Sequence, residues 1–99
     1  MTEKIYTKEE LNRETARINW PELETHFARG VVLCVDTGLD LVEVATSIAN
    51  DDKAAVEAWI NAGKVAHLDM FTAKDWGGRD PDLWAVVVAP WVVVQEREK

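Results

Sequence analysis

The chain has 99 residues, a length that suits one domain, and its 47% hydrophobic content is enough for one core. Its 18 acidic and 11 basic side chains give a formal net charge of −7, which repels phosphate backbones and anionic lipid headgroups. A single domain over residues 1–99 is therefore predicted, with neither nucleic acid nor a membrane as a partner.

The first thirty residues predict two short helices. The first should begin at the T-x-x-E capping box of Thr7 and Glu10 and continue through Ile18, which shares its apolar stripe. Proline disfavours a helical conformation in the residue before it and suits the first turn of a helix, so Pro21 should start a second helix. That helix is expected to end at Gly30.

The middle of the chain predicts a buried strand followed by a pair of helices. Residues 31–35 are apolar and mostly β-branched, as in a buried strand. A helix should begin at Asp40 and run to about Asn50, because its apolar residues recur at spacings of three and four. Asp52 should cap a second helix that ends at Gly63.

The last third predicts three strands and one helical turn. A weakly alternating strand is expected over 64–68, and one turn of helix over 72–76, stopped by the glycine pair that follows. Residues 83–95, LWAVVVAPWVVVQ, are apolar at odd and even positions alike, so both faces of this element should be covered. Pro90 cannot lie in the middle of a central strand, which indicates two strands meeting there.

Together these elements predict an α+β fold. We expect a single small domain in which a short mixed or antiparallel sheet of three to four strands packs with about four helices.

Three segments carry a resemblance to a known family. LNRETARINWPELETHFARG, DLVEVATSIANDDKAAVEAWINAG and LWAVVVAPWVVVQ, in this order and spacing, resemble a family of short bacterial proteins known as domain of unknown function 2288. The resemblance covers nearly the whole chain, and its most specific piece is LWAVVVAPWVVVQ. It implies a bacterial, cytoplasmic, stand-alone domain and brings no catalytic residue with it.

The usual sequence signatures of enzymes are missing from the chain. It has no glycine-rich phosphate loop and no paired zinc ligands, and no cofactor is expected. The single cysteine, Cys34, lies in an apolar run and should be inert core. The amino terminus lacks a stretch suited to a signal peptide, so we expect a cytoplasmic location.

One group of polar residues supports an enzymatic alternative. Asp36, Asp40 and Glu43 follow a strand and begin a helix, a position where sites of α/β proteins often gather. With His67 and Asp69 they are the candidate site of the alternative function, a small metal-dependent hydrolase or ligand-binding protein. The competing interpretation is that these acids form a turn and helix caps.

The five tryptophans favour an interaction role. So much aromatic area is hard to bury in a small domain, and interfaces are enriched in tryptophan. The main hypothesis is a non-enzymatic protein-interaction module that acts as a homodimer, with another protein as a second candidate partner and Trp76, Trp84 and Trp91 at the contact surface. Packing of these rings in the core is the alternative.

Overall fold

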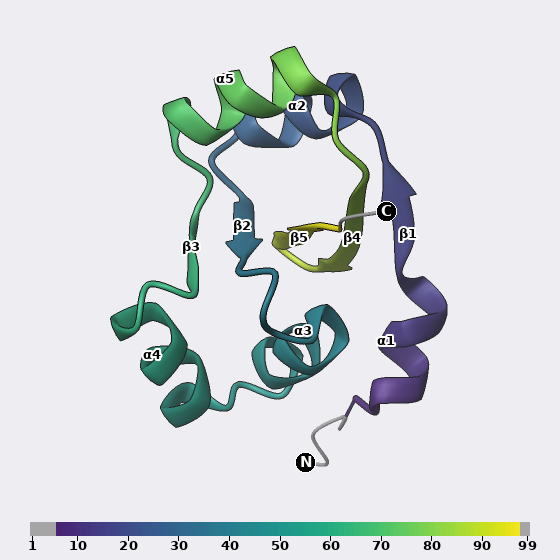
Figure 1. The fold of residues 1–99 in the computed structure, drawn as a ribbon. Helices are drawn as coiled ribbons and strands as arrows, with labels where there is room; N and C mark the ends of the chain where they lie inside the picture. Colours follow the sequence, from purple (N-terminus) through teal and green to yellow (C-terminus); the bar gives the residue numbers. More distant parts are fainter. Residues whose placement is uncertain (1–5, 98–99) are drawn as a thin grey trace.

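A five-stranded mixed sheet forms the middle layer of the molecule (Figure 1). The computed structural model describes residues 6–97. The strands are β1 (Ala16–Ile18), β2 (Val32–Val35), β3 (Val65–His67), β4 (Leu83–Val88) and β5 (Trp91–Glu96). Their order across the sheet is β1-β4-β5-β2-β3.

The sheet is antiparallel except at its centre. β2 and β5 run parallel, with Val32 opposite Val92, while β1 with β4, β4 with β5 and β2 with β3 pair antiparallel. β4 and β5 form a hairpin that turns at Ala89 and Pro90, so the predicted division of the long apolar run is confirmed.

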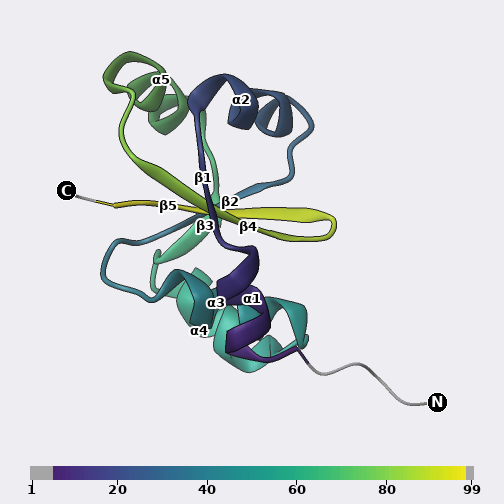
Figure 2. The ribbon, with the colours of Figure 1, turned by 90° about the vertical axis from the view of Figure 1, so that its right-hand side faces the viewer.

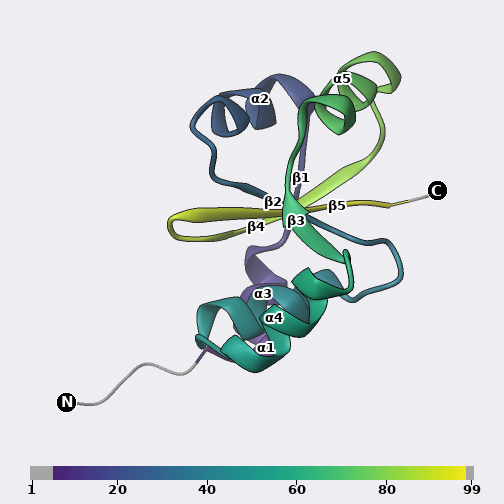
Figure 3. The ribbon, with the colours of Figure 1, turned by 90° about the vertical axis from the view of Figure 1, so that its left-hand side faces the viewer.

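Helices cover both faces of this sheet. They are α1 (Lys8–Glu14), α2 (Trp20–Ala28), α3 (Leu41–Ala49), α4 (Lys53–Asn61) and α5 (Met70–Arg79). α2 and α5 lie on one face, and α1, α3 and α4 lie on the other, as the two side views show (Figures 2 and 3). Within residues 6–97, no helix combines the length and the apolar character needed to cross a membrane.

The apolar residues of β4 and β5 alternate between two cores. Leu83 and Ala85 pack under α2 and α5, whereas Val86 packs under α1 and α3. On β5, Val92 packs in the core under α2 and α5, and Val93 packs in the core under α1 and α3. Successive strand residues point to opposite faces, so a run that is apolar at every position requires a layer on each side. The sequence prediction that both faces are covered is confirmed for most of this run, whereas Val87, close to the turn, is 62% exposed.

Each helix begins where a short polar side chain accepts a hydrogen bond from its first turn. The N-cap residues are Thr7, Asn19, Asp40, Asp52 and Asp69. These caps satisfy amide donors that have no partner inside the helix.

The counts of strands and helices correct the sequence prediction. The sheet has five strands and the domain five helices, not three to four strands and about four helices. The unpredicted strand is β1: the first helix ends at Glu14, and Thr15 is already extended. β1 pairs with the outer edge of β4, so a long apolar strand gains a partner on a side that would otherwise be open.

The glycine pair also corrects the prediction. α5 starts at Met70 and continues through Gly77 and Gly78, instead of forming one turn over 72–76. It ends where Asp80 takes the left-handed conformation, with φ 50°. Gly77 packs against Trp20 of α2, and the preceding Trp76 bonds to Glu96 of β5, so tertiary contacts support this part of the helix despite the low helix propensity of glycine.

Candidate interaction site

An apolar groove lies between α2 and α5. Phe71 and Met70, in the first turn of α5, are 90% and 79% exposed, more than any other large apolar side chain of the described chain. They border a groove of about 670 Å³ whose surface is mostly apolar. We call it the α2–α5 groove; its lining residues are Trp20, Glu24, Phe27, Met70, Phe71, Ala73, Lys74 and Gly77.

The start of α5 explains why Phe71 and Met70 reach solvent. Asp69 accepts a hydrogen bond from the Thr72 amide at 2.7 Å, which sets the first turn. Ala73 and Trp76, three residues apart, are then the buried positions of the helix. The rest of the first turn extends beyond the core, so two large apolar side chains remain uncovered.

A close contact between the two helices forms one wall of the groove. A Cβ atom at Gly77 would lie 3.1 Å from Trp20 Nε1, so glycine lets the indole pack directly on the backbone of α5. The same indole tilts against Phe27, with ring centroids 6.3 Å apart. One wall of the groove is therefore built from packed aromatic rings.

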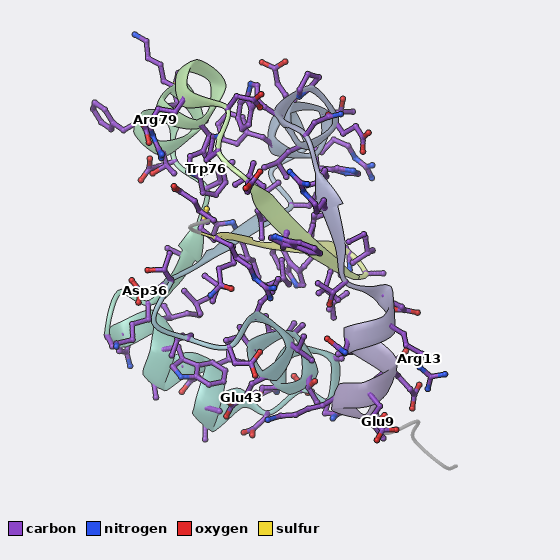
Figure 4. The ribbon with its side chains drawn as sticks, turned by 45° about the vertical axis from the view of Figure 1, so that its right-hand side comes forward. Glu9, Arg13, Asp36, Glu43, Trp76 and Arg79 are labelled. Atoms are coloured by element: carbon purple, nitrogen blue, oxygen red, sulfur yellow. The ribbon has the colours of Figure 1, made fainter. Side chains whose placement is uncertain are left out.

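An ion cluster fixes the other end of α5 to the sheet. Trp76 Nε1 donates to Glu96 of β5 at 3.2 Å, and Arg79 pairs with Glu96 at 2.9 Å and with Asp75 at 2.6 Å. Hydrogen bonds from Arg79 lower the pKa of the Glu96 and Asp75 carboxyls and raise the pKa of Arg79 itself. Figure 4 shows Trp76 and Arg79 on this helix.

The three tryptophans predicted as interface residues do not share one surface. Trp76 is 5% exposed and packs in the core under α2 and α5. Trp84 and Trp91 are half-buried beside the opposite core. The Arg97 guanidinium lies 5.1 Å from the Trp84 ring centroid, and Trp91 meets His67 edge-on at 5.4 Å. Trp76 thus has little surface for a partner, whereas Trp84 and Trp91 retain some.

The acidic residues proposed for a metal or ligand site have local partners. Asp36 accepts from the Gly38 amide at 2.9 Å, Asp40 accepts from Val42 at 3.0 Å, and Asp69 caps α5. Glu43 lies 4.0 Å from the Lys8 ammonium and stands apart from Asp36 in Figure 4.

The same residues do not assemble into a metal site. No three histidine, cysteine or carboxylate side chains of residues 6–97 are placed to hold a metal ion together. The capping and turn roles considered for Asp36, Asp40 and Asp69 match these contacts, whereas Glu43 makes an ion pair in place of the predicted capping contact.

The carboxyl ends of the parallel strands β2 and β5 also form a hollow, of about 490 Å³. Gln95, which is 4% exposed, lines it and donates to the Asp36 and Leu39 carbonyls at 2.9 and 2.6 Å. Its amide group therefore holds the loop before α3.

Cys34 is a poor nucleophile in this position. Burial, with a smaller contribution from the charge of Asp69, raises the pKa of its thiol to about 12. The reactive thiolate is therefore scarce near neutral pH.

Met70 and Phe71 are the residues that sequence reasoning missed. The predicted helix began at Thr72, which left both outside any element. The available signal was their adjacency after Asp69, a good N-cap residue: two large apolar side chains at the start of a helix do not both reach a core defined by Ala73 and Trp76.

The fold and the groove define a small α+β domain with helices on both faces of a mixed sheet and an apolar groove on one of them. The chain belongs to the family described as "Protein of unknown function (DUF2288)", whose model matches residues 6–96, which confirms the resemblance seen in the sequence. It is similar to PA1075 from Pseudomonas aeruginosa, with 53% identity, and its fold matches the NMR solution structure of that protein with a TM-score of 0.83. The match covers 100% of this chain and 93% of the other. No curated protein matches the chain.

Proposed function

We propose that the chain is a non-enzymatic protein-interaction domain that acts as a homodimer in the bacterial cytoplasm, with the α2–α5 groove as its contact surface. The observation that carries the proposal is the pair of exposed side chains, Phe71 at 90% and Met70 at 79%, beside an aromatic groove. Contiguous apolar surface of this kind is typical of interaction sites, whereas isolated exposed residues are not.

The polar rim of the groove suits a second copy of the same chain. Glu24 lies on α2 and Lys74 on α5, and both line the groove. In a two-fold dimer the same patch of both copies forms the interface. If Glu24 of one copy contacts Lys74 of the other, the reverse contact is therefore made as well. A patch with one acid and one base can then form the same ion pair twice, with Phe71 of each copy in the apolar groove of the other.

Sedimentation equilibrium over a range of protein concentrations tests the proposal. The wild-type chain should have twice its monomer mass, and Phe71→Ser should weaken self-association at least about tenfold, as expected for a central aromatic contact. Because Phe71 is 90% exposed in the monomer, the circular dichroism spectrum of the Phe71→Ser variant should stay native.

Ile60→Ser is the matched control. Ile60 is also exposed, at 52%, but lies on α4 across the sheet, so this variant should dimerise like the wild type. A wild-type monomer at all concentrations would refute the homodimer. Equal weakening by the Phe71 and Ile60 variants would refute the choice of groove.

A further inference from the structure

A second groove lies on the opposite side of the sheet, around Trp91. One hollow of about 380 Å³ lies beside the β4–β5 turn, and another of about 230 Å³ lies beside α4. Ile48 and Trp91 line both hollows, so the two adjoin. We call the combined surface the Trp91 groove; its surface is partly polar and partly apolar, and its apolar side chains include Ile48, Val56, Pro90 and Trp91.

Helix α4 leaves part of this apolar surface uncovered. None of its residues is fully buried, whereas the neighbouring α3 buries four. Val56, which lines the groove, is half-buried, and Ile60, one turn later on the same stripe but outside the two hollows, is 52% exposed. α4 is thus an amphipathic helix whose apolar stripe is only partly used by its own domain.

The rim of the Trp91 groove is acidic. Four carboxylates line its two hollows, from Glu14, Asp51, Asp52 and Glu57. Lys53 is the one basic side chain among the described lining residues, and its ammonium lies 4.0 Å from Asp51. Apolar side chains beside a negative rim suit a ligand that is both apolar and positively charged.

We propose that the Trp91 groove binds a basic amphipathic segment of another protein. Apolar side chains of the segment cover Trp91, Ile48 and Val56, while its lysines or arginines face the acidic rim. Such segments bind grooves by laying one apolar face on the apolar side chains of the groove. A second copy of this chain does not suit the groove, because two-fold pairing would bring one acidic rim against another.

This inference goes beyond the proposed homodimer and does not depend on it. The Trp91 groove and the α2–α5 groove lie against different helical layers, so occupation of one leaves the other open (Figure 1).

Fluorescence anisotropy with synthetic peptides tests the inference on the full chain. The probe is a labelled helix of about 18 residues, roughly five turns, with leucine on one face and lysine on the other. One comparison peptide replaces lysine by glutamate, and another replaces leucine by serine at the same charge. The leucine–lysine peptide should bind, and both comparison peptides should bind at least about tenfold more weakly.

A charge-neutral triple variant locates the site. Asp51→Asn, Asp52→Asn and Glu57→Gln remove three rim charges with nearly unchanged side-chain shape. Asparagine tolerates the positive φ of Asp51 and can replace Asp52 as the N-cap of α4, so the fold should be kept. The variant should bind the leucine–lysine peptide about tenfold more weakly, since three exposed ion pairs are lost.

The matched control neutralises three exposed acids elsewhere. Glu9→Gln, Glu22→Gln and Asp80→Asn change the net charge equally, and Asp80, like Asp51, has positive φ. This control should bind the peptide like the wild type. Equal weakening by both triple variants, binding of the serine peptide as tight as that of the leucine peptide, or no binding at all would overturn the inference.

Discussion

The two faces of the sheet are covered to different extents. On one face, α3 alone contributes four buried residues, Leu41, Val42, Val44 and Ala45, and α1 and α4 lie beside it. On the other face, α2 contributes one buried residue and α5 two. The α2–α5 groove remains between those two helices. The difference shows that burial by helices is uneven: α3 closes the core beneath it, whereas α2 and α5 leave a groove between them and α4, beside α3, leaves the Trp91 groove.

The largest expected effect compares the two layers directly. Leu41 of α3 and Leu23 of α2 are both 0% exposed, so each alanine substitution should lower the free energy of unfolding by about 2–5 kcal/mol. We expect Leu41→Ala to cost more, because α3 packs against α1, α4, β4 and β5, whereas α2 packs against α5 and β2. Urea unfolding at pH 7 measures both. An equal or larger loss for Leu23→Ala would contradict this difference between the layers.

A second comparison uses one tryptophan from each face. Trp76→Phe removes a buried indole and its hydrogen bond to Glu96, which should lower the free energy of unfolding by about 2 kcal/mol. Trp84→Phe should cost less than about 1 kcal/mol, because the half-buried ring keeps its apolar contacts and a weaker cation–π contact with Arg97. The same urea titrations apply. If Trp84→Phe proved the more damaging change, Trp76 would not be the anchor of α5.

A smaller effect should separate the two glycines of α5. No side chain or backbone lies within 4 Å of a Cβ built at Gly78, so Gly78→Ala should raise stability by about 0.5–1 kcal/mol through helix propensity. Gly77→Ala should lose that gain or destabilise, because its Cβ would press on Trp20. Thermal unfolding of both variants checks the pair. If Gly77→Ala raised the stability, Trp20 would have to shift at little cost, and the wall of the α2–α5 groove would not be rigid.

Much of the fold could be predicted from local chemistry. The caps at Thr7, Asp40 and Asp52 and the turn at Pro90 all depend on neighbouring residues and were predicted. β1 was not, because its strand conformation depends on pairing with β4, far along the chain. The spacing of Leu11 and Ile18 suits a helix as well, and only the tertiary partner decides between them.

The candidate site was less predictable than the fold. The tryptophan content indicated exposed aromatic surface, but it did not identify which aromatic ring is exposed. Trp76 is buried and bonds to Glu96 of β5, whereas Phe71 is 90% exposed. Which apolar residue remains exposed depends on where each helix begins and ends and on how many helices cover that face of the sheet. Sequence periodicity assigns a face to a residue but does not say whether another helix covers that face.

The smallest effect concerns the acid stability of the ion cluster on the α5 face. Arg79 lowers the folded-state pKa of Glu96 and Asp75, while in the unfolded chain these carboxyls titrate near their usual value of about 4. The ionised carboxylates therefore stabilise the fold above that value. As the pH falls, the unfolded chain takes up protons first, and the stabilisation is lost as the pH passes through the lowered folded pKa.

Arg79→Met should remove this dependence and make the loss of stability between about pH 5 and pH 3 shallower than in the wild type. Arg13→Met is the control with the same charge change, since Arg13 donates to the backbone carbonyl of Glu9 instead of to a carboxylate. Figure 4 shows Arg13 and Glu9 on α1. The acid limb of Arg13→Met should follow the wild type in urea titrations at several pH values. If the stability of the Arg79→Met and Arg13→Met variants falls in parallel with pH, the ion cluster contributes only through the net charge of the protein. The attachment of α5 to β5 then depends on the packing of Trp76.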